Sequence, residues 1–130
     1  MKVERLDHLV LTVANIETTA QFYTAVLGMQ RVSFGEGRVA LAFGKQKINL
    51  HQCGEEFNPH ASAPTAGSGD LCFITDSKIE TMQAHLAACG VQVTVGPVRR
   101  TGAIGPIDSL YFDDPDGNLI EVSTYALEGE

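Results

Sequence analysis

The chain has 130 residues and a net charge of −7, with 44% hydrophobic and 19% charged residues. This composition is ordinary for a globular protein, and the length suits one domain or two small modules that share a core. The acidic balance argues against nucleic-acid binding, because positive charge is densest at Arg99-Arg100 and two residues cannot neutralise a run of phosphates. No apolar run is long enough for a membrane span or a signal core, so we expect a cytoplasmic protein without membrane contact.

The first half of the chain indicates one strand, one helix and three further strands. Residues 6–13 form a β-rich run that alternates between two faces, with His8, Val10 and Thr12 on one of them. Asn15 is a good N-cap for a helix whose apolar residues recur at helical spacing until Gly28 ends it. Module 1 covers about residues 1–53 and is completed by predicted strands at residues 30–34, 38–43 and 47–53.

The second half repeats this order. Residues 54–69 are rich in Gly, Pro, Ala, Ser and Thr, which indicates a linker between the halves. A strand at residues 70–75 is followed by a predicted capping box at residues 77–80 and a helix that Gly90 ends. Module 2 covers about residues 70–127, and its remaining strands are predicted near residues 91–95, 109–112 and 119–124.

The repeat predicts an α+β fold in a single domain of residues 1–130. Each βαβββ module is too small to bury its own sheet face, so the two modules should pack together. We expect a curved, cup-shaped mixed sheet with the helices on the outside.

Four possible metal ligands fall at matching positions of the repeat. The first strands of the two modules carry His8 and Asp70, and the last strands carry His51 and Glu121 when residues 49–51 are overlaid on 119–121. All four have the parity of the face away from the helices. Two imidazoles with one or two carboxylates suit Zn²⁺, Ni²⁺, Mn²⁺, Co²⁺ or Fe²⁺. The sequence therefore predicts a divalent metal site inside the cup.

The remaining cysteines and histidines lack such a pattern. Cys53, Cys72 and Cys89 are odd in number and show no CxxC spacing, so we expect reduced thiols in small apolar roles. His60 lies in the linker and His85 in the second helix, where solvated side chains are expected.

Three stretches resemble the vicinal oxygen chelate superfamily, which includes glyoxalase I, extradiol dioxygenases, fosfomycin-resistance transferases and bleomycin-binding proteins. These are Leu6 to Leu11, the helix end Leu27-Gly28-Met29, and the run from Tyr111 to Glu121 with its Asp-Pro-Asp-Gly turn. The nearest group comprises the glyoxalase-domain-containing proteins that carry residues 44–51 and 100–103 in this form. Members of this length typically form homodimers, which the resemblance implies for this chain.

The ligand positions differ in one respect from those of glyoxalase I, which usually carry His or Gln, Glu, His and Glu along the chain. Here they are His8, His51, Asp70 and Glu121, so the middle pair is exchanged. Asp is shorter than His, which leaves Asp70 as a ligand, a hydrogen-bond acceptor to a ligand or a base. Fosfomycin transferases place His where Asp70 stands, and bleomycin-binding proteins lack the ligands.

The resemblance implies glyoxalase I-like lyase or isomerase chemistry on a small α-oxo substrate, such as a glutathione hemithioacetal, through an enediolate. A carboxylate then moves the proton, with Glu121 the first choice and Asp70 the second. Arg99, Arg100 and Thr101, on a predicted loop, are candidates to hold an anionic substrate. The alternatives are an iron-dependent ring-cleaving oxygenase, with His8, His51 and Glu121 as its triad, and a non-catalytic binding protein that sequesters a ligand.

Overall fold

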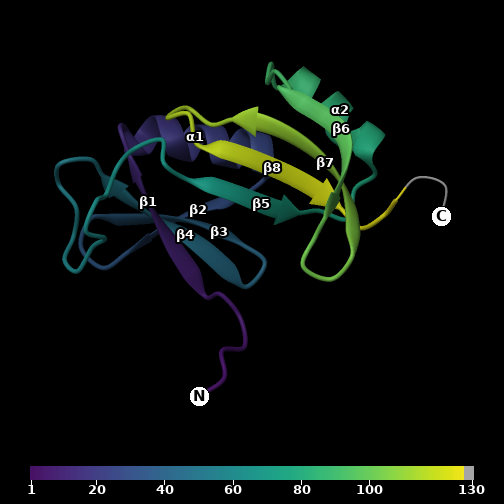
Figure 1. The fold of residues 1–130 in the computed structure, drawn as a ribbon. Helices are drawn as coiled ribbons and strands as arrows, with labels where there is room; N and C mark the ends of the chain where they lie inside the picture. The colour runs from purple at the N-terminus through teal and green to yellow at the C-terminus, as the bar shows by residue number, and fades with distance from the viewer. Residues whose placement is uncertain (128–130) are drawn as a thin grey trace. The chain divides into compact units, whose positions relative to one another are not determined.

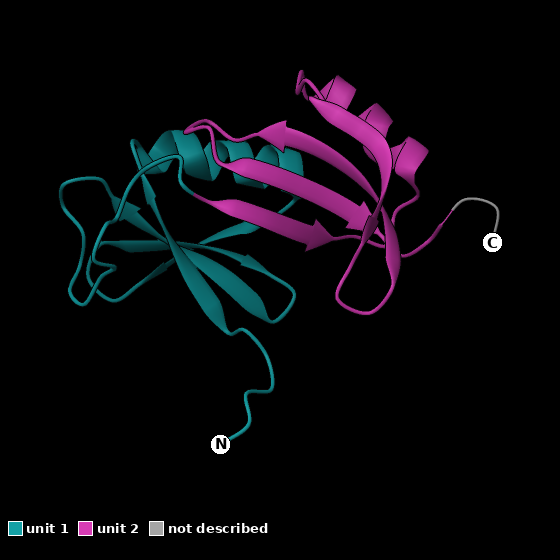
Figure 2. Ribbon diagram, in the orientation of Figure 1, with its two compact units in different colours: residues 1–68 teal, residues 69–130 magenta. Residues whose placement is uncertain are grey.

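The computed structural model describes residues 1–127 and divides the chain into two compact units, residues 1–68 and residues from 69 onward (Figure 2). Each unit has the predicted βαβββ order, which confirms the α+β fold and the duplicated module (Figure 1). Among the described residues, no helix is both long and apolar enough to cross a membrane.

Unit 1 is a four-stranded sheet with one helix. Its strand order is β1-β4-β3-β2, in which β1 pairs parallel with β4 and the other pairs are antiparallel. The side chains of Leu41, Ile48 and Leu50 are almost completely buried and lie at the centre of the core. The elements are β1 (His8–Val13), α1 (Ile16–Leu27), β2 (Gln30–Phe34), β3 (Arg38–Phe43) and β4 (Gln46–Gln52).

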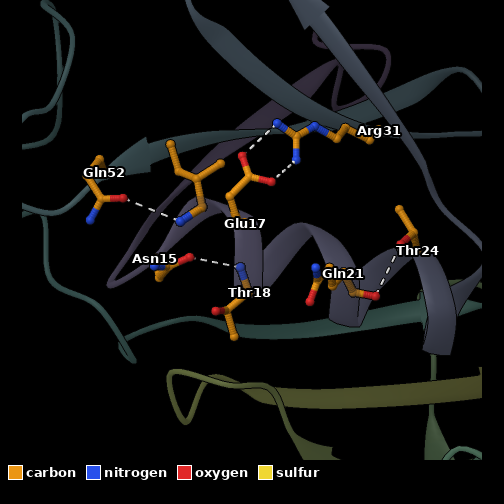
Figure 3. A network of polar contacts seen from close by, with 8 residues as sticks. Asn15, Glu17, Thr18, Gln21, Thr24, Arg31 and Gln52 are labelled. Carbon is orange, nitrogen blue, oxygen red and sulfur yellow. Dashed lines mark hydrogen bonds and ion pairs between the residues drawn. The ribbon is translucent and has the colours of Figure 1, made fainter.

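Helix α1 begins and ends where the sequence predicts. The side chain of Asn15 accepts a hydrogen bond from Thr18 N at 2.9 Å, and Gly28 takes the left-handed conformation with φ 65°. In the first turn, the Glu17 carboxylate receives both Nη groups of Arg31 in β2, at 2.5 and 2.8 Å (Figure 3). The ion pair therefore attaches the start of the helix to the edge strand.

Unit 2 repeats the architecture with strand order β5-β8-β7-β6, and β5 pairs parallel with β8. In α2, Ile79, Met82 and Leu86 are buried as predicted, whereas Cys89 is exposed. The helix begins one residue after Lys78 without a side-chain cap, so the predicted capping box is wrong. The elements are β5 (Asp70–Ile74), α2 (Ile79–Ala88), β6 (Val95–Thr101), β7 (Pro106–Asp113) and β8 (Leu119–Thr124).

The largest error in the predicted elements concerns β6. It begins at Val95, where the predicted strand ends, and continues through the stretch that we predicted as a loop. A bulge between Val95 and Val98 accommodates Gly96-Pro97, a pair of residues that usually interrupts a strand. At Gly96, with φ 115°, a Cβ would lie 2.6 Å from the carbonyl oxygen of Ser109, so only glycine fits there.

The Asp-Pro-Asp-Gly turn between β7 and β8 is held by its own side chains. Asp114 Oδ1 accepts from the backbone N of Asp116 and Asn118, each at 2.9 Å, and Asn118 Nδ2 donates to Asp114 Oδ2 at 2.7 Å. Asn118 Oδ1 accepts from Gly69 N at 2.7 Å, and Leu119 N donates to Gly69 O at 3.0 Å. The turn thereby fixes the residue that precedes β5.

Among the described residues, Cys53, Cys72 and Cys89 form no disulfide, and all three are exposed, so they do not take the apolar packing roles that we expected.

Candidate functional site

In each unit the helix covers one face of the sheet and leaves the other for polar side chains. In unit 1, Gln52 Oε1 accepts a hydrogen bond from Ile16 N at the start of α1 (Figure 3). Gln52 therefore lies on the side of the sheet that faces the helix, and so does Leu50, because side chains two residues apart on a strand point to the same face. His8 and His51 have the opposite parity. We call the side away from the helix the open face, in both units.

The strand register does not bring His8 and His51 together. In the parallel pair of β1 and β4, His8 lies opposite Lys47 and His51 lies opposite Thr12. The two histidines are therefore offset by four residues, or about 13 Å along the strands. Side chains that stand roughly perpendicular to a sheet at this separation do not reach one ion.

Asp70 and Glu121, in contrast, lie near each other in unit 2. Asp70 is opposite Leu119 and Glu121 is opposite Cys72, which offsets the two carboxylates by two residues, or about 7 Å along the strands. The register also changes the predicted alignment of the two modules, which matched His51 with Glu121. The pair of His8 and Lys47 in unit 1 corresponds to the pair of Asp70 and Leu119 in unit 2. Counted along β4 and β8 from these pairs, Asn49 is the equivalent of Glu121 and His51 is the equivalent of Ser123.

Within residues 1–127, no group of three or more His, Cys, Asp and Glu side chains is placed to hold a metal ion. His8 and Asp70 are exposed. Asp7 Oδ2 lies 2.8 Å from His8 Nδ1, which leaves the other ring nitrogen pointing away from that contact. The four-ligand site stays a prediction.

His51 is almost completely buried, at 2% exposure, on the open face of unit 1. Arg38 Nη2 lies 3.3 Å from His51 Nε2, and the Phe57 ring packs edge-on against the imidazole with centroids 5.6 Å apart. Burial lowers the pKa of His51, the charge of Arg38 lowers it further, and the charge of Glu56 opposes both. The imidazole is therefore held neutral.

Arg38 lies between two aromatic rings, with its guanidinium carbon 4.9 Å from the Phe34 centroid and 4.8 Å from that of Phe57. Lys47 Nζ is 3.7 Å from the Phe34 centroid on the same face. Arg38 is thus the cation in contact with His51, whereas Lys47 lies four positions away from His51 on β4.

Two buried polar atoms of this cluster have no hydrogen-bond partner among the described residues, Asn49 Oδ1 and His51 Nδ1. Asn49 is 5% exposed and precedes His51 by two positions on the same face. A buried unsatisfied donor or acceptor costs about 1–3 kcal/mol, so each atom calls for an explanation.

A pocket of about 490 Å³ adjoins His51 beneath the segment that joins β4 to β5. Thr12 and His60 contribute polar groups, and the remaining walls are largely apolar, with Val10 and Pro64 among them. His60 was expected to be merely solvated, but it lines this pocket.

On the open face of unit 2, the Glu121 carboxylate is held by serine hydroxyls. Ser109 Oγ donates to Glu121 Oε2 at 2.6 Å, and Ser123 Oγ lies 3.3 Å from the same oxygen. The two serines contact each other at 2.7 Å, and both are completely buried. Cys72 Sγ lies 3.3 Å from Ser123 Oγ. Glu121 is thus oriented by a fixed polar network.

Glu121 lines a pocket of about 420 Å³ in unit 2, together with Arg100, Thr101 and Tyr111. Arg100 Nε donates to the Tyr111 hydroxyl at 3.2 Å, and Tyr111 lies directly opposite Glu121 in the antiparallel pair of β7 and β8. Strand β6 therefore places a cation in the same pocket as the carboxylate.

Arg99 does not share this pocket. Its Nε pairs with Asp108 Oδ1 at 2.7 Å, and its parity on β6 is opposite to that of Arg100. Of the three residues predicted on a loop as candidates to hold an anionic substrate, Arg100 and Thr101 line this pocket from strand β6, and Arg99 instead pairs with Asp108.

Sequence reasoning missed four residues around the candidate groups: Arg38 and Phe57, which contact His51, and Ser109 and Tyr111, which lie on the strand beside Glu121. Strand parity relative to Glu121 was a usable signal for Ser109 and Tyr111, since both lie on β7 opposite β8. No pattern in the sequence pointed to Phe57, which lies in the segment of unit 1 between β4 and β5.

Comparison with known proteins adds a family to this geometry. The model of the Glyoxalase/Bleomycin resistance protein/Dioxygenase superfamily matches residues 5–122. The virulence protein STM3117 of Salmonella typhimurium is 55% identical over 96% of this chain and 87% of its own length. The glyoxalase domain-containing protein RDO1 of Mycosarcoma maydis is 56% identical over 96% of this chain and 70% of its own length.

Solved structures agree. The integron cassette protein VCH_CASS1 of V. cholerae has a TM-score of 0.95 and 62% identity, and the match covers 97% of this chain and 98% of that one. A lactoylglutathione lyase from Agrobacterium tumefaciens, at 23% identity with full coverage of both chains, has a TM-score of 0.74 and shares the fold.

Proposed function

Because the chain belongs to the Glyoxalase/Bleomycin resistance protein/Dioxygenase superfamily, we propose that it is a metal-dependent, glyoxalase I-like lyase or isomerase. Its substrate is a small α-oxo compound, with a glutathione hemithioacetal as the first candidate. The observation that carries this proposal is Glu121, a carboxylate fixed by two serine hydroxyls inside a pocket that also holds Arg100.

The donor set fits a divalent metal ion only in part. Asp70 and Glu121 are close enough in register to act together, and His8 is the first-strand counterpart of Asp70. His51 fits poorly, because Arg38 contacts one ring nitrogen and its positive charge opposes a second cation. We therefore propose Asp70 and Glu121 as ligands for Zn²⁺, Ni²⁺, Mn²⁺, Co²⁺ or Fe²⁺, with His8 as a third ligand and His51 as the least suited of the four predicted ones.

A bound divalent ion would supply Lewis acidity that polarises a substrate carbonyl. Proton transfer then falls to the carboxylates of the chain. Both serine hydrogen bonds go to Oε2 of Glu121, so we assign the proton to Oε1, which those bonds leave available. Asp70 is the second candidate for this step.

Arg100 and Thr101 are proposed to hold an anionic group of the substrate. Arg100 is positioned by its bond to the Tyr111 hydroxyl and by the stacking of its guanidinium 5.6 Å from that ring. Arg99 is excluded from this role by its ion pair with Asp108. We also propose that the protein is cytoplasmic and forms a homodimer. Sedimentation equilibrium tests the dimer directly.

The deciding experiment combines elemental analysis with a hemithioacetal assay. Purified protein should contain about one divalent ion per chain or take one up. It should isomerise the glutathione hemithioacetal of methylglyoxal, or exchange the substrate α-proton with D₂O as followed by NMR. Metal-loaded protein that does neither would overturn the proposal. Bound iron with O₂ uptake would instead indicate the oxygenase, and ligand binding without metal or turnover would indicate a sequestering protein.

A further inference from the structure

We propose that the pocket beside His51 in unit 1 binds the carboxylate of a small, largely apolar organic acid, with the Nδ1–H group of His51 as its buried hydrogen-bond donor. The inference does not rest on the proposed enzymatic function. It starts from the Arg38–His51 contact, the two unsatisfied polar atoms and the pocket.

The contact with Arg38 fixes the tautomer of His51. A guanidinium has only donors, so its 3.3 Å contact with Nε2 requires that nitrogen to be the acceptor. A neutral imidazole that accepts at Nε2 carries its proton at Nδ1. Arg38 thus makes His51 a donor through the nitrogen that the rest of the described chain leaves without a partner.

Unit 2 provides an internal comparison. Its equivalent positions are Glu121 and Ser123, which contact each other and Ser109. In unit 1 the equivalent Asn49 and His51 are both buried, and each retains an unpaired polar atom. Because buried donors are nearly always paired in proteins, the unit 1 arrangement is typical of a site that an external group completes.

The surroundings select an anionic acceptor. Arg38 has no carboxylate partner among residues 1–127, and Lys47 stands on the same face. Glu56 is the carboxylate near His51, and its Oε2 accepts from Gly54 N. The guanidinium of Arg38, in contact with His51 and without a carboxylate of its own, would therefore attract a carboxylate at Nδ1 against the opposing charge of Glu56, and the low exposure of His51 strengthens that attraction.

The pocket also limits the rest of the ligand. Its volume of about 490 Å³ suits a small molecule, and its apolar walls include Val10, Ala61, Ala63 and Pro64. The hydroxyl of Thr12, which lies opposite His51 on β1, is a second donor in reach of the same pocket. An aromatic or short aliphatic acid matches this combination.

The test uses metal-free protein, with benzoate as the probe and benzyl alcohol as its neutral counterpart. In ¹⁵N-histidine-labelled protein, His51 should show a protonated Nδ1 and an unprotonated Nε2 before any ligand is added. Benzoate should shift the Nδ1 and Nδ1–H resonances of His51, and benzyl alcohol should bind at least about tenfold more weakly. The assay requires neither metal nor turnover, so a failure of benzoate binding is distinguishable from a failure of the proposed enzymatic function.

Three variants complete the test. His51→Phe should weaken benzoate binding by about tenfold or more, whereas His51→Asn, which keeps a donor near the Nδ1 position, should retain most of it. Arg38→Ala should also weaken binding, and Arg31→Ala, whose side chain pairs with Glu17, should leave it unchanged. A wild-type His51 protonated at Nε2, or the lack of a His51 response to benzoate at millimolar concentration, would overturn the inference.

Discussion

The two units share one scaffold and differ in how they treat the same pair of positions on β4 and β8. In unit 2, Glu121 and Ser123 belong to a closed network that includes Ser109. In unit 1, Asn49 and His51 are buried more deeply than Glu121, yet each leaves one polar atom unpaired. The difference shows that the two modules place side chains at equivalent positions, although the residue types at these positions, and therefore their hydrogen bonding, differ.

The neighbours of each pair account for the contrast. Small hydroxyl side chains surround Glu121 and satisfy its charge locally. The Phe57 ring and the Arg38 guanidinium contact His51, and Arg38 lies between Phe34 and Phe57. Unit 2 therefore presents a fixed carboxylate, and unit 1 presents a fixed donor.

The largest effect is expected from removing the charge of that carboxylate. Glu121→Gln should lower kcat/KM for the hemithioacetal by about 10²–10⁴-fold, because the residue is assigned to proton transfer. Glu80→Gln, an exposed change on α2, is the matched control and should leave the rate unchanged. Equal activity of the Glu121→Gln and wild-type proteins would refute the role of Glu121.

A smaller effect is expected from loosening the network around it. Ser109→Ala removes the 2.6 Å bond to Glu121 and the 2.7 Å contact with Ser123, and should destabilise the protein by about 1 kcal/mol in urea unfolding. Activity should fall by about tenfold, and less in the Glu121→Gln background because the two residues act together. If the two effects on activity simply multiply, Ser109 does not act through Glu121.

On the unit 1 side, His51 predicts a loss of stability in acid. Its pKa in the folded protein lies below the usual value of 6.5, so the unfolded chain binds the proton more readily. This contribution is fully present above pH 6.5 and is lost as the pH falls through the folded pKa. Thermal unfolding of His51→Phe should show a flatter profile below pH 6.5 than the wild type. An unchanged profile in His51→Phe would contradict the assignment.

The smallest effect is expected at the surface of unit 1, away from either pocket. Glu17→Gln breaks the ion pair with Arg31 and should lower Tm only slightly, because both side chains are exposed and solvent screens their charges. The difference from the wild type should shrink further in 1 M NaCl. A large drop in Tm at high salt would show that the pair contributes more than electrostatics.

The sequence predicted the fold well because local patterns determine it. Alternation gave β3 and β8 their observed bounds, and Asn15 and Gly28 marked the ends of α1. The failure at β6 arose because Gly96 and Pro97 signal a break in most contexts, whereas here they occupy a bulge against Ser109.

The candidate site was predicted less completely, since parity tells which face a residue occupies but not which residue lies opposite. His8 and His51 were placed on the correct face, and their four-residue offset depends on a pairing that only the register reveals. Arg38 and Phe57 contact His51 from separate segments, so their spacing in the sequence does not predict the contact.

The hydrogen bonds of Gly69 with Asn118 and Leu119 bear on the effect of a proteolytic cut in the chain. They secure the first residue of unit 2 to its own last hairpin, so both four-stranded sheets are complete on either side of residues 54–68. A single proteolytic nick in that segment would therefore remove no strand from either sheet.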